Sequence, residues 1–178
     1  KHFVYVSTIG CKEMAKTVKI AQAKLAVSKE LEKSNFTWSV LEPTGFFDDM
    51  KKLFDSVKKR GTAFVFSDGN TKLNPIHGID LANAAVKAIK DPSWHNKYIP
   101  IGGPDTYTHN QIAALSFEVL GMPPKIRHIP LWVLKVFSLI LRPFNPNVAN
   151  FLWFFISMGI MNMDAPSFGN HHLKDFFQ

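Results

Sequence analysis

An apolar strand, a long helical segment and a second apolar strand open this chain of 178 residues, and their order constrains the fold most. The first strand is predicted over Phe3–Val6, where every residue is β-branched or aromatic. Lys12–Lys33 repeats apolar side chains with a period close to 3.6, which predicts one amphipathic helix. Thr37–Leu41 is the next predicted strand. A right-handed crossover between the two strands would make them parallel neighbours in one sheet.

The ends of these two strands carry the first candidate site residue. Ser7 follows the first strand, and Pro43 and Gly45 end the second. Ligands bind to doubly wound sheets at the carboxyl ends of their strands. Ser7 is therefore a candidate ligand contact, and the alternative is a hydroxyl that only caps the following turn.

Strand and helix signals alternate through the rest of the chain. Strands are predicted at 62–66 and 97–101, and helices at 47–59, 81–90, 108–120, 131–141 and 148–161. Asp80 is placed to cap the helix that follows it, and Thr108 with Gln111 forms a capping-box pattern. The alternation favours an α/β fold in which a helical C-terminal section forms one wall of a cleft.

Composition and charge exclude some classes of function. The net charge is +7, but Glu13, Glu30 and Glu32 stand among the lysines of the 12–33 segment. This mixture is typical of a solvated helix face, so we predict no nucleic-acid partner. The single cysteine, Cys11, cannot form an internal disulfide and indicates a reducing compartment. With no signal-peptide pattern ahead of the first strand, we predict a cytoplasmic protein.

The segment from Ile129 to Met163 is strongly apolar, but Lys135 and the Arg142-Pro-Phe-Asn-Pro146 turn interrupt it. Its uninterrupted pieces are shorter than the roughly 20 residues that span a bilayer. Buried helices, or helices that cover a substrate cleft, are the favoured interpretation, and peripheral membrane contact is the alternative. For the aromatic run at 151–155, core packing is favoured over a substrate wall.

Motifs in a fixed order resemble one known family. They are Phe3-Val-Tyr-Val-Ser7, Ala23-Lys24, Leu41-Glu-Pro-Thr-Gly-Phe-Phe47, Asn74-Pro-Ile-His-Gly-Ile-Asp-Leu-Ala82, Ile101-Gly-Gly-Pro-Asp-Thr-Tyr-Thr108 and Phe168-Gly-Asn-His-His-Leu-Lys-Asp-Phe-Phe177. Together they resemble the NmrA-like group of atypical short-chain dehydrogenases, which includes NAD(P)-binding oxidoreductases, nucleoside-diphosphate-sugar epimerases and non-catalytic redox sensors. The resemblance implies the C-terminal part of a Rossmann-type doubly wound parallel sheet. Residues 1–60 would be the remaining dinucleotide-binding part, and 61–178 a mostly helical substrate-side section within one compact unit.

The glycine-rich turn of such proteins, which holds the dinucleotide pyrophosphate, has no counterpart among the ten glycines of this chain. The resemblance therefore implies a portion of a longer protein, in which these 178 residues alone bind NAD or NADP weakly or not at all. The strand Phe3–Val6 would then lack one neighbour. We expect its exposed edge to pair with a second copy, which would give a homo-oligomer.

The resemblance also implies roles for individual residues. Ser7 would donate a hydrogen bond to a substrate oxygen, and Lys24 would contact the nicotinamide ribose and lower the pKa of a neighbouring acid. The nicotinamide end of the cofactor would be lined by the turn of Pro43, Thr44, Gly45, Phe46 and Phe47. The alternatives are one more solvated lysine at position 24 and a turn that only reverses the chain.

Two positions depart from the family pattern. Ile20 stands where the short-chain enzymes carry the tyrosine that moves a proton, and Glu42 stands where relatives usually carry arginine. Elsewhere, His77 and Asp80 are interpreted as a packed turn residue and a helix cap. His171 and His172 are adjacent, so they point to opposite faces, and with no third ligand in view we predict no metal site.

The predicted function is that of an NAD(P)-binding oxidoreductase or epimerase acting on a small carbonyl or sugar-nucleotide substrate. Loss of the acid/base tyrosine favours the alternative, a non-catalytic dinucleotide-binding sensor or assembly factor. A peripheral membrane or scaffold protein is the third class that the sequence leaves open.

Overall fold

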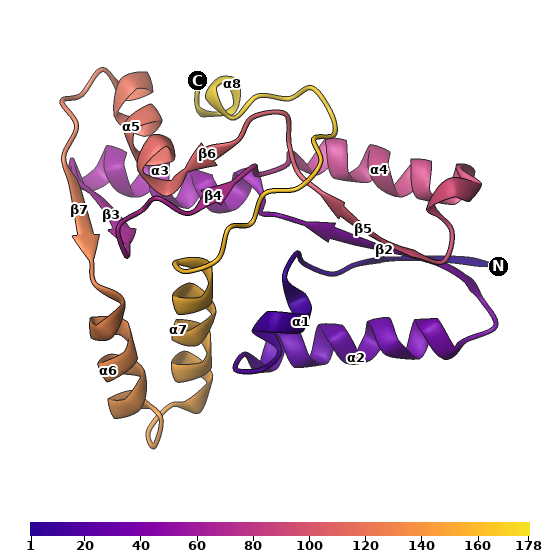
Figure 1. Cartoon of the computed structure of the whole chain (residues 1–178). Coiled ribbons are helices and arrows are strands. Elements are labelled where there is room, and N and C mark those ends of the chain that lie inside the picture. Colours follow the sequence, from indigo (N-terminus) through magenta and orange to yellow (C-terminus); the bar gives the residue numbers. More distant parts are fainter.

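Three parallel strands form the main sheet, and helices cover both of its faces (Figure 1). The computed structural model describes residues 1–178, apart from the side chain of Met158. The strands lie in the order β1 (His2–Val6), β2 (Thr37–Pro43) and β5 (Lys97–Ile101). Tyr5 lies opposite Val40 in the register, and Val40 lies opposite Tyr98. The parallel α/β arrangement that the sequence predicts is confirmed.

Helix α4 (Gly78–Lys90) lies on one face of this sheet and α2 (Lys19–Lys33) on the other (Figure 1). The prediction of one helix over 12–33 is wrong at its N-terminal end, because α1 (Cys11–Met14) is separate. Between them the backbone of Val18 is extended, and its side chain is buried. The break lets Cys11, Met14 and Val18 enter the same core cluster as the α2 residues. Burial of these side chains therefore overrides the continuous helical periodicity.

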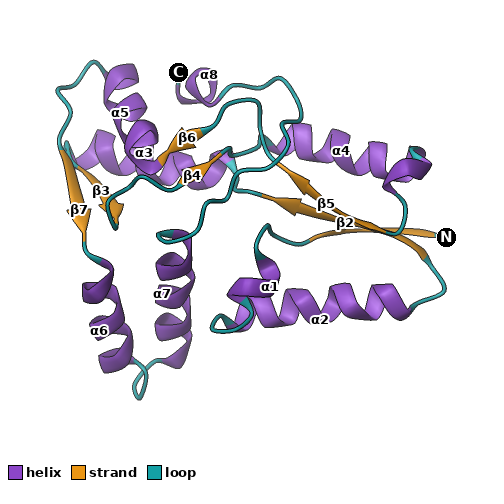
Figure 2. Cartoon of the chain, in the orientation of Figure 1, coloured by secondary structure: helices purple, strands orange, loops and turns teal.

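A second region is built on α3 (Phe47–Arg60) and α5 (His109–Leu120) (Figure 2). Its remaining elements are the parallel pair β3 (Ala63–Phe66) and β7 (Ile126–Ile129), the antiparallel pair β4 (Lys72–Leu73) and β6 (Tyr107–Thr108), and α8 (Leu173–Phe177). The short 3₁₀ helix η1 (Pro92–Trp94) leads into β5. Phe54 of α3 stacks on Phe177 of α8 at a ring distance of 4.7 Å, so the C-terminus closes this core.

Two helix starts test the predicted caps. The capping box at α5 is confirmed, since Thr108 Oγ1 accepts from the Gln111 N–H and Gln111 Oε1 accepts from the Thr108 N–H. The predicted Asp80 cap of α4 is wrong. His77 is the N-cap, and its Nδ1 accepts from the Ile79 N–H at 3.2 Å. Asp80 lies inside the first turn of α4. Its carboxylate oxygens make hydrogen bonds with His171, which is distant in the sequence.

Helices α6 (Leu131–Leu141) and α7 (Pro146–Met158) form an antiparallel hairpin that extends away from the rest of the molecule (Figure 1). Asn145 caps α7, and Pro146 fits the first helical position, so α7 begins two residues before the predicted range. The interpretation of α6 as a buried helix is wrong, because Trp132, Phe137 and Leu139 are all more than half exposed. Among the helices that the structure describes, none is long and apolar enough to cross a membrane.

Gly103 supplies a prediction about stability. A Cβ at this position would overlap the backbone carbonyl oxygen of Pro75, whereas a Cβ at Gly78 meets nothing within 4 Å. We expect Gly103→Ala to lower the free energy of unfolding by about 2 kcal/mol, because the backbone must move to admit the methyl group. Gly78→Ala is the matched control and should lie within about 0.5 kcal/mol of the parent. Urea unfolding measures both, and equal stabilities would contradict the close approach.

Candidate functional site

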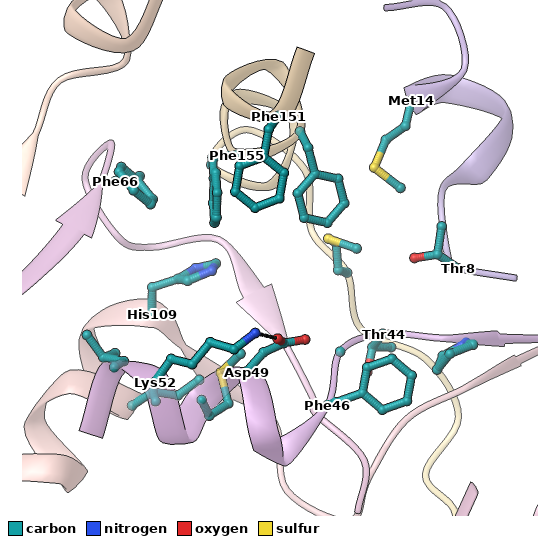
Figure 3. A pocket seen from close by; sticks show the side chains of 18 of the residues that line it. Thr8, Met14, Thr44, Phe46, Asp49, Lys52, Phe66, His109, Phe151 and Phe155 are labelled. Atoms are coloured by element: carbon teal, nitrogen blue, oxygen red, sulfur yellow. Dashed lines mark hydrogen bonds and ion pairs between the residues drawn. The ribbon is translucent and has the colours of Figure 1, made fainter. Parts of the chain in front are cut away.

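A cavity of about 530 Å³ opens at the carboxyl ends of β1 and β2 (Figure 3). The strand ends, helix α2, the α3–β3 and α5 region and helix α7 all contribute to its wall. Its lining includes Ser7, Ile20, Lys24, Pro43, Thr44, Gly45, Phe46, Asp49, Lys52, Phe64, Phe66, His109, Phe151, Phe154 and Phe155. This is the edge at which doubly wound sheets bind ligands.

Ser7 lines this cavity with an unsatisfied hydroxyl. The residue is 4% exposed, and its Oγ has no hydrogen-bond partner among the described residues. Its backbone N–H donates to the Leu41 carbonyl at 2.8 Å, which fixes the backbone at the end of β1. The hydroxyl therefore does not cap the following turn. A buried hydroxyl without a partner costs roughly 1–3 kcal/mol, and a ligand oxygen in the cavity would relieve that cost.

Lys24 brings a positive charge to the end of β1. Its Nζ donates to the Val6 carbonyl at 3.1 Å and to the Ser7 carbonyl at 3.4 Å, and it lies 5.8 Å from the centroid of the Tyr5 ring. These contacts distinguish it from the solvated lysines of the same helix. One turn earlier, Ile20 also lines the cavity and is 61% exposed. The position of the family's proton-transferring tyrosine is therefore apolar and open.

The turn after β2 is held in place by backbone contacts with residues 74–76. Thr44 Oγ1 donates to the Asn74 carbonyl at 2.5 Å, and the Ile76 N–H donates to the Gly45 carbonyl at 2.8 Å. Pro43, Thr44, Gly45 and Phe46 line the cavity. Phe47 does not, because it is 1% exposed and packs in the core against the rings of His77 and Phe176.

Glu42, the second departure from the family pattern, is half-buried beside this turn. Burial raises the pKa of its carboxyl group, and the positive charge of Lys12 opposes that shift. Glu42 therefore lies within the electrostatic reach of a lysine.

An aromatic wall closes the other side of the cavity (Figure 3). It is formed by Phe64 and Phe66 of β3 and by Phe151, Phe154 and Phe155 of α7. The Phe66 and Phe155 rings lie 5.3 Å apart, which joins the two elements. For the 151–155 run the sequence favoured core packing, and Trp153 and Phe154 do pack against the main core cluster, although Phe154 also lines the cavity. The i, i+3, i+4 spacing of the three α7 phenylalanines was the signal for a shared face.

His109, which sequence reasoning did not select, lies at the start of α5 and faces the cavity (Figure 3). Its Nδ1 lies 3.1 Å from Thr71 Oγ1 and 3.3 Å from the Thr71 carbonyl oxygen. Burial lowers the pKa of the ring, so the ring is neutral at pH 7. Donation from Nδ1–H to the Thr71 carbonyl leaves Nε2 as an acceptor. Nearby, Lys52 Nζ donates to Asp49 Oδ1 at 2.6 Å.

The two adjacent histidines near the C-terminus bind separate carboxylates. His171 Nδ1 lies 2.8 Å from Asp80 Oδ1, and His172 Nδ1 lies 2.7 Å from Asp105 Oδ2. The His77 ring stacks on His171 at 4.5 Å. These contacts hold the C-terminal segment against α4 and the loop after β5, and none of the four residues lines the cavity.

The parallel sheet with helices on both faces, and a cavity at the carboxyl ends of its strands, define a Rossmann-type α/β protein. No model of a known protein family matches the chain. Maize divinyl chlorophyllide a 8-vinyl-reductase is 30% identical, over 99% of this chain and 50% of its own length. The photosystem II assembly factor Ycf39 of Trieres chinensis is 22% identical, over 78% of this chain and 43% of its own length.

Among solved structures, an NADPH-dependent quinone oxidoreductase from Escherichia coli, complexed with NADPH, superposes with a TM-score of 0.78 at 15% identity. The match covers 99% of this chain and 64% of that one. The chain thus spans about half the length of the curated relatives it matches. Its homologues and structural neighbours include NAD(P)-binding NmrA-like and epimerase-like reductases, to which the chain is similar.

Two histidines are expected to titrate in opposite directions. Burial keeps the pKa of His109 below 6.5, so its neutral form favours folding, and stability should fall as the pH drops through 6.5 towards that lower pKa. The hydrogen bond that the His172 ring donates to Asp105 raises the pKa of His172, so its contribution to stability is complete below pH 6.5 and is lost as the pH rises through the raised pKa. Histidine ring shifts in NMR would measure both. Asp105→Asn should return the His172 pKa towards 6.5 and leave that of His109 unchanged.

Proposed function

We propose that this chain forms the substrate side, and the nicotinamide-facing edge, of an NAD(P)-dependent oxidoreductase that acts on a small, largely apolar carbonyl compound. One observation carries the proposal: the unpaired Ser7 hydroxyl, the Lys24 ammonium group and the 43–46 turn meet at one cavity. A sugar nucleotide, the other substrate class considered from the sequence, needs many polar partners. The aromatic wall favours a planar apolar body with one polar end.

The residues present fit one end of the cofactor. The cavity presents Gly45 of the turn and, at the end of β1, the buried, unpaired hydroxyl of Ser7. Both can contact an amide or a carbonyl group. No glycine-rich phosphate turn occurs in the 178 residues, so these residues hold no cradle for the pyrophosphate. When bound, NAD(P) supplies or accepts a hydride. In this proposal, the chain positions the substrate against the bound cofactor.

The side chains then have separable roles in this proposal. Ser7 Oγ–H donates to the substrate oxygen, where negative charge develops during reduction. The ammonium group of Lys24, held at the end of β1, stabilises that charge electrostatically. The phenylalanines of β3 and α7 exclude water and orient the substrate plane.

The second candidate function is a non-catalytic dinucleotide-binding sensor or assembly factor. Ile20 favours it, because no proton donor stands one turn before Lys24. One relative is named as a photosystem II assembly factor, which shows that the matched portion also occurs in proteins named for assembly.

Two further proposals concern the setting of the chain. β1 is the edge strand of the described sheet and Phe3 is 47% exposed, which supports pairing of this edge with a second copy. Sedimentation equilibrium that returns only monomer would contradict the pairing.

Cys11 is free and buried, which supports a reducing compartment such as the cytoplasm.

The catalytic proposal predicts that Ser7→Ala and Lys24→Met each lower kcat/KM by about 10²-fold, because each removes a group that stabilises developing negative charge. The measurement is NADPH oxidation by the longest natural form of the protein, with quinones, enones and other apolar carbonyls as substrates. Lys29→Met is the matched control, since Lys29 is exposed on the same helix, and it should retain parent activity.

The outcomes separate the two functions. Saturable NADPH binding without turnover of any substrate would favour the non-catalytic sensor over the oxidoreductase. Equal loss in Lys24→Met and Lys29→Met would contradict the role given to Lys24. The 178-residue chain alone should show no saturable NADPH binding at micromolar concentrations, because the pyrophosphate has no cradle; micromolar affinity would contradict that expectation.

A further inference from the structure

The outer face of α6 is apolar and has no partner within the described structure. Leu134 and Ser138 face α7, and Ser138 Oγ donates to the Ala149 carbonyl at 3.1 Å. The residues that point away from α7 are Trp132, Val136, Phe137, Leu139 and Ile140, which are between 47% and 66% exposed. Figure 1 shows the hairpin projecting from the body, and the exposure of these side chains shows that no other described part of the chain covers this face. Soluble surfaces rarely expose so many large apolar side chains together.

The apolar surface continues past the end of α6. Phe144, in the turn between the helices, is 83% exposed, and Phe151 on α7 is 60% exposed. Phe151 also lines the mouth of the cavity. Large exposed apolar side chains therefore occur on α6, in the turn and on α7.

The charge pattern of this region is one-sided. Residues 119–163 contain no aspartate or glutamate, and their cations are Lys125, Arg127, Lys135 and Arg142. All four are exposed. Lys135 and Arg142 are seven residues apart, so they lie on the same side of α6, between the apolar face and α7. Long cationic side chains in that position bury their stems and direct their charges to an anionic boundary.

This charge pattern favours an anionic membrane over a second copy of the chain as the partner of the α6 face. A second copy packed face to face would bring the same cations together, and like charges across an interface disfavour that packing. A bilayer with anionic lipids offers an apolar layer for the α6 face and negative headgroups for the cations at its border. Trp132 suits the headgroup boundary, where tryptophan is enriched.

The dimensions agree with an interfacial position. The 11 residues of α6 measure about 16 Å along the helix axis, about half of the roughly 30 Å hydrocarbon core of a bilayer. The helix is too short to span but long enough to lie in the interface plane, with its apolar face immersed about 5–10 Å deep.

We propose that the α6–α7 hairpin docks the protein on membranes that contain anionic lipids, with the outer face of α6 in the interface. The docking surface itself does not depend on the catalytic proposal.

The test is flotation of the 178-residue chain with vesicles of phosphatidylcholine alone, or of three parts phosphatidylcholine to one part phosphatidylglycerol. We expect flotation with the anionic vesicles. Phe137→Ser with Ile140→Ser should weaken the partition constant by about tenfold or more, because two exposed apolar side chains leave the lipid. The matched control is Val86→Ser with Ile89→Ser, an equally spaced exposed apolar pair on α4, which should bind like the parent.

A charge-reversal pair separates the electrostatic part. Lys135→Glu with Arg142→Glu should abolish the preference for anionic vesicles, while Lys58→Glu with Lys59→Glu, which changes the net charge equally on α3, should retain most of it. Circular dichroism checks that each variant is folded. Absence of the parent chain from the anionic vesicles would overturn the proposal, and so would equal losses in the α6 and α4 pairs. A dimer that only the α6 pair dissociates, without vesicle binding, would assign the face to a second copy instead.

Discussion

One buried amide, that of Asn74, joins the segments on which the cavity depends. Its Nδ2 donates to the carbonyls of Gly103 and Ala165, and its Oδ1 accepts from the Ala165 N–H. Its backbone carbonyl accepts from Thr44 Oγ1 and from the Gly103 N–H. The residue is 1% exposed, so loss of any partner would leave a polar group unsatisfied in the core. The turn after β2, the end of β5 and the C-terminal segment are thus held as one unit.

The site inherits its geometry from that unit and from the crossover between β1 and β2. The crossover places α2 so that Lys24 reaches the carbonyl groups at the end of β1. Asn74 fixes the turn that faces them. Different parts of the chain form the polar end and the aromatic end of the cavity, so the two ends differ in chemistry. A ligand with one oxygen and a flat apolar body would enter in a single orientation.

Local patterns explain what could be predicted from the sequence. The strands, the α/β class and the capping box at Thr108 depend on neighbours within a few residues, and they are confirmed. Ser7 and Lys24 come together because the crossover helix α2 lies beside the end of β1. The break after Met14 and the His77 cap were missed because they depend on distant contacts, and the aromatic wall stood only as the alternative to core packing. Asp80 is occupied by His171, 91 residues away, and no periodicity reports such a contact.

The sequence separation of the Asn74 contacts also affects the order in which the structure forms during synthesis. Asn74 and Ala165 are 91 residues apart, so the turn that lines the cavity is completed by a segment that leaves the ribosome well after the turn itself. Contacts of such separation form late, after local helices and hairpins. A growing chain would therefore expose the apolar α6–α7 hairpin before its cavity exists. In this molecule, the apolar hairpin therefore leaves the ribosome before the pocket is complete.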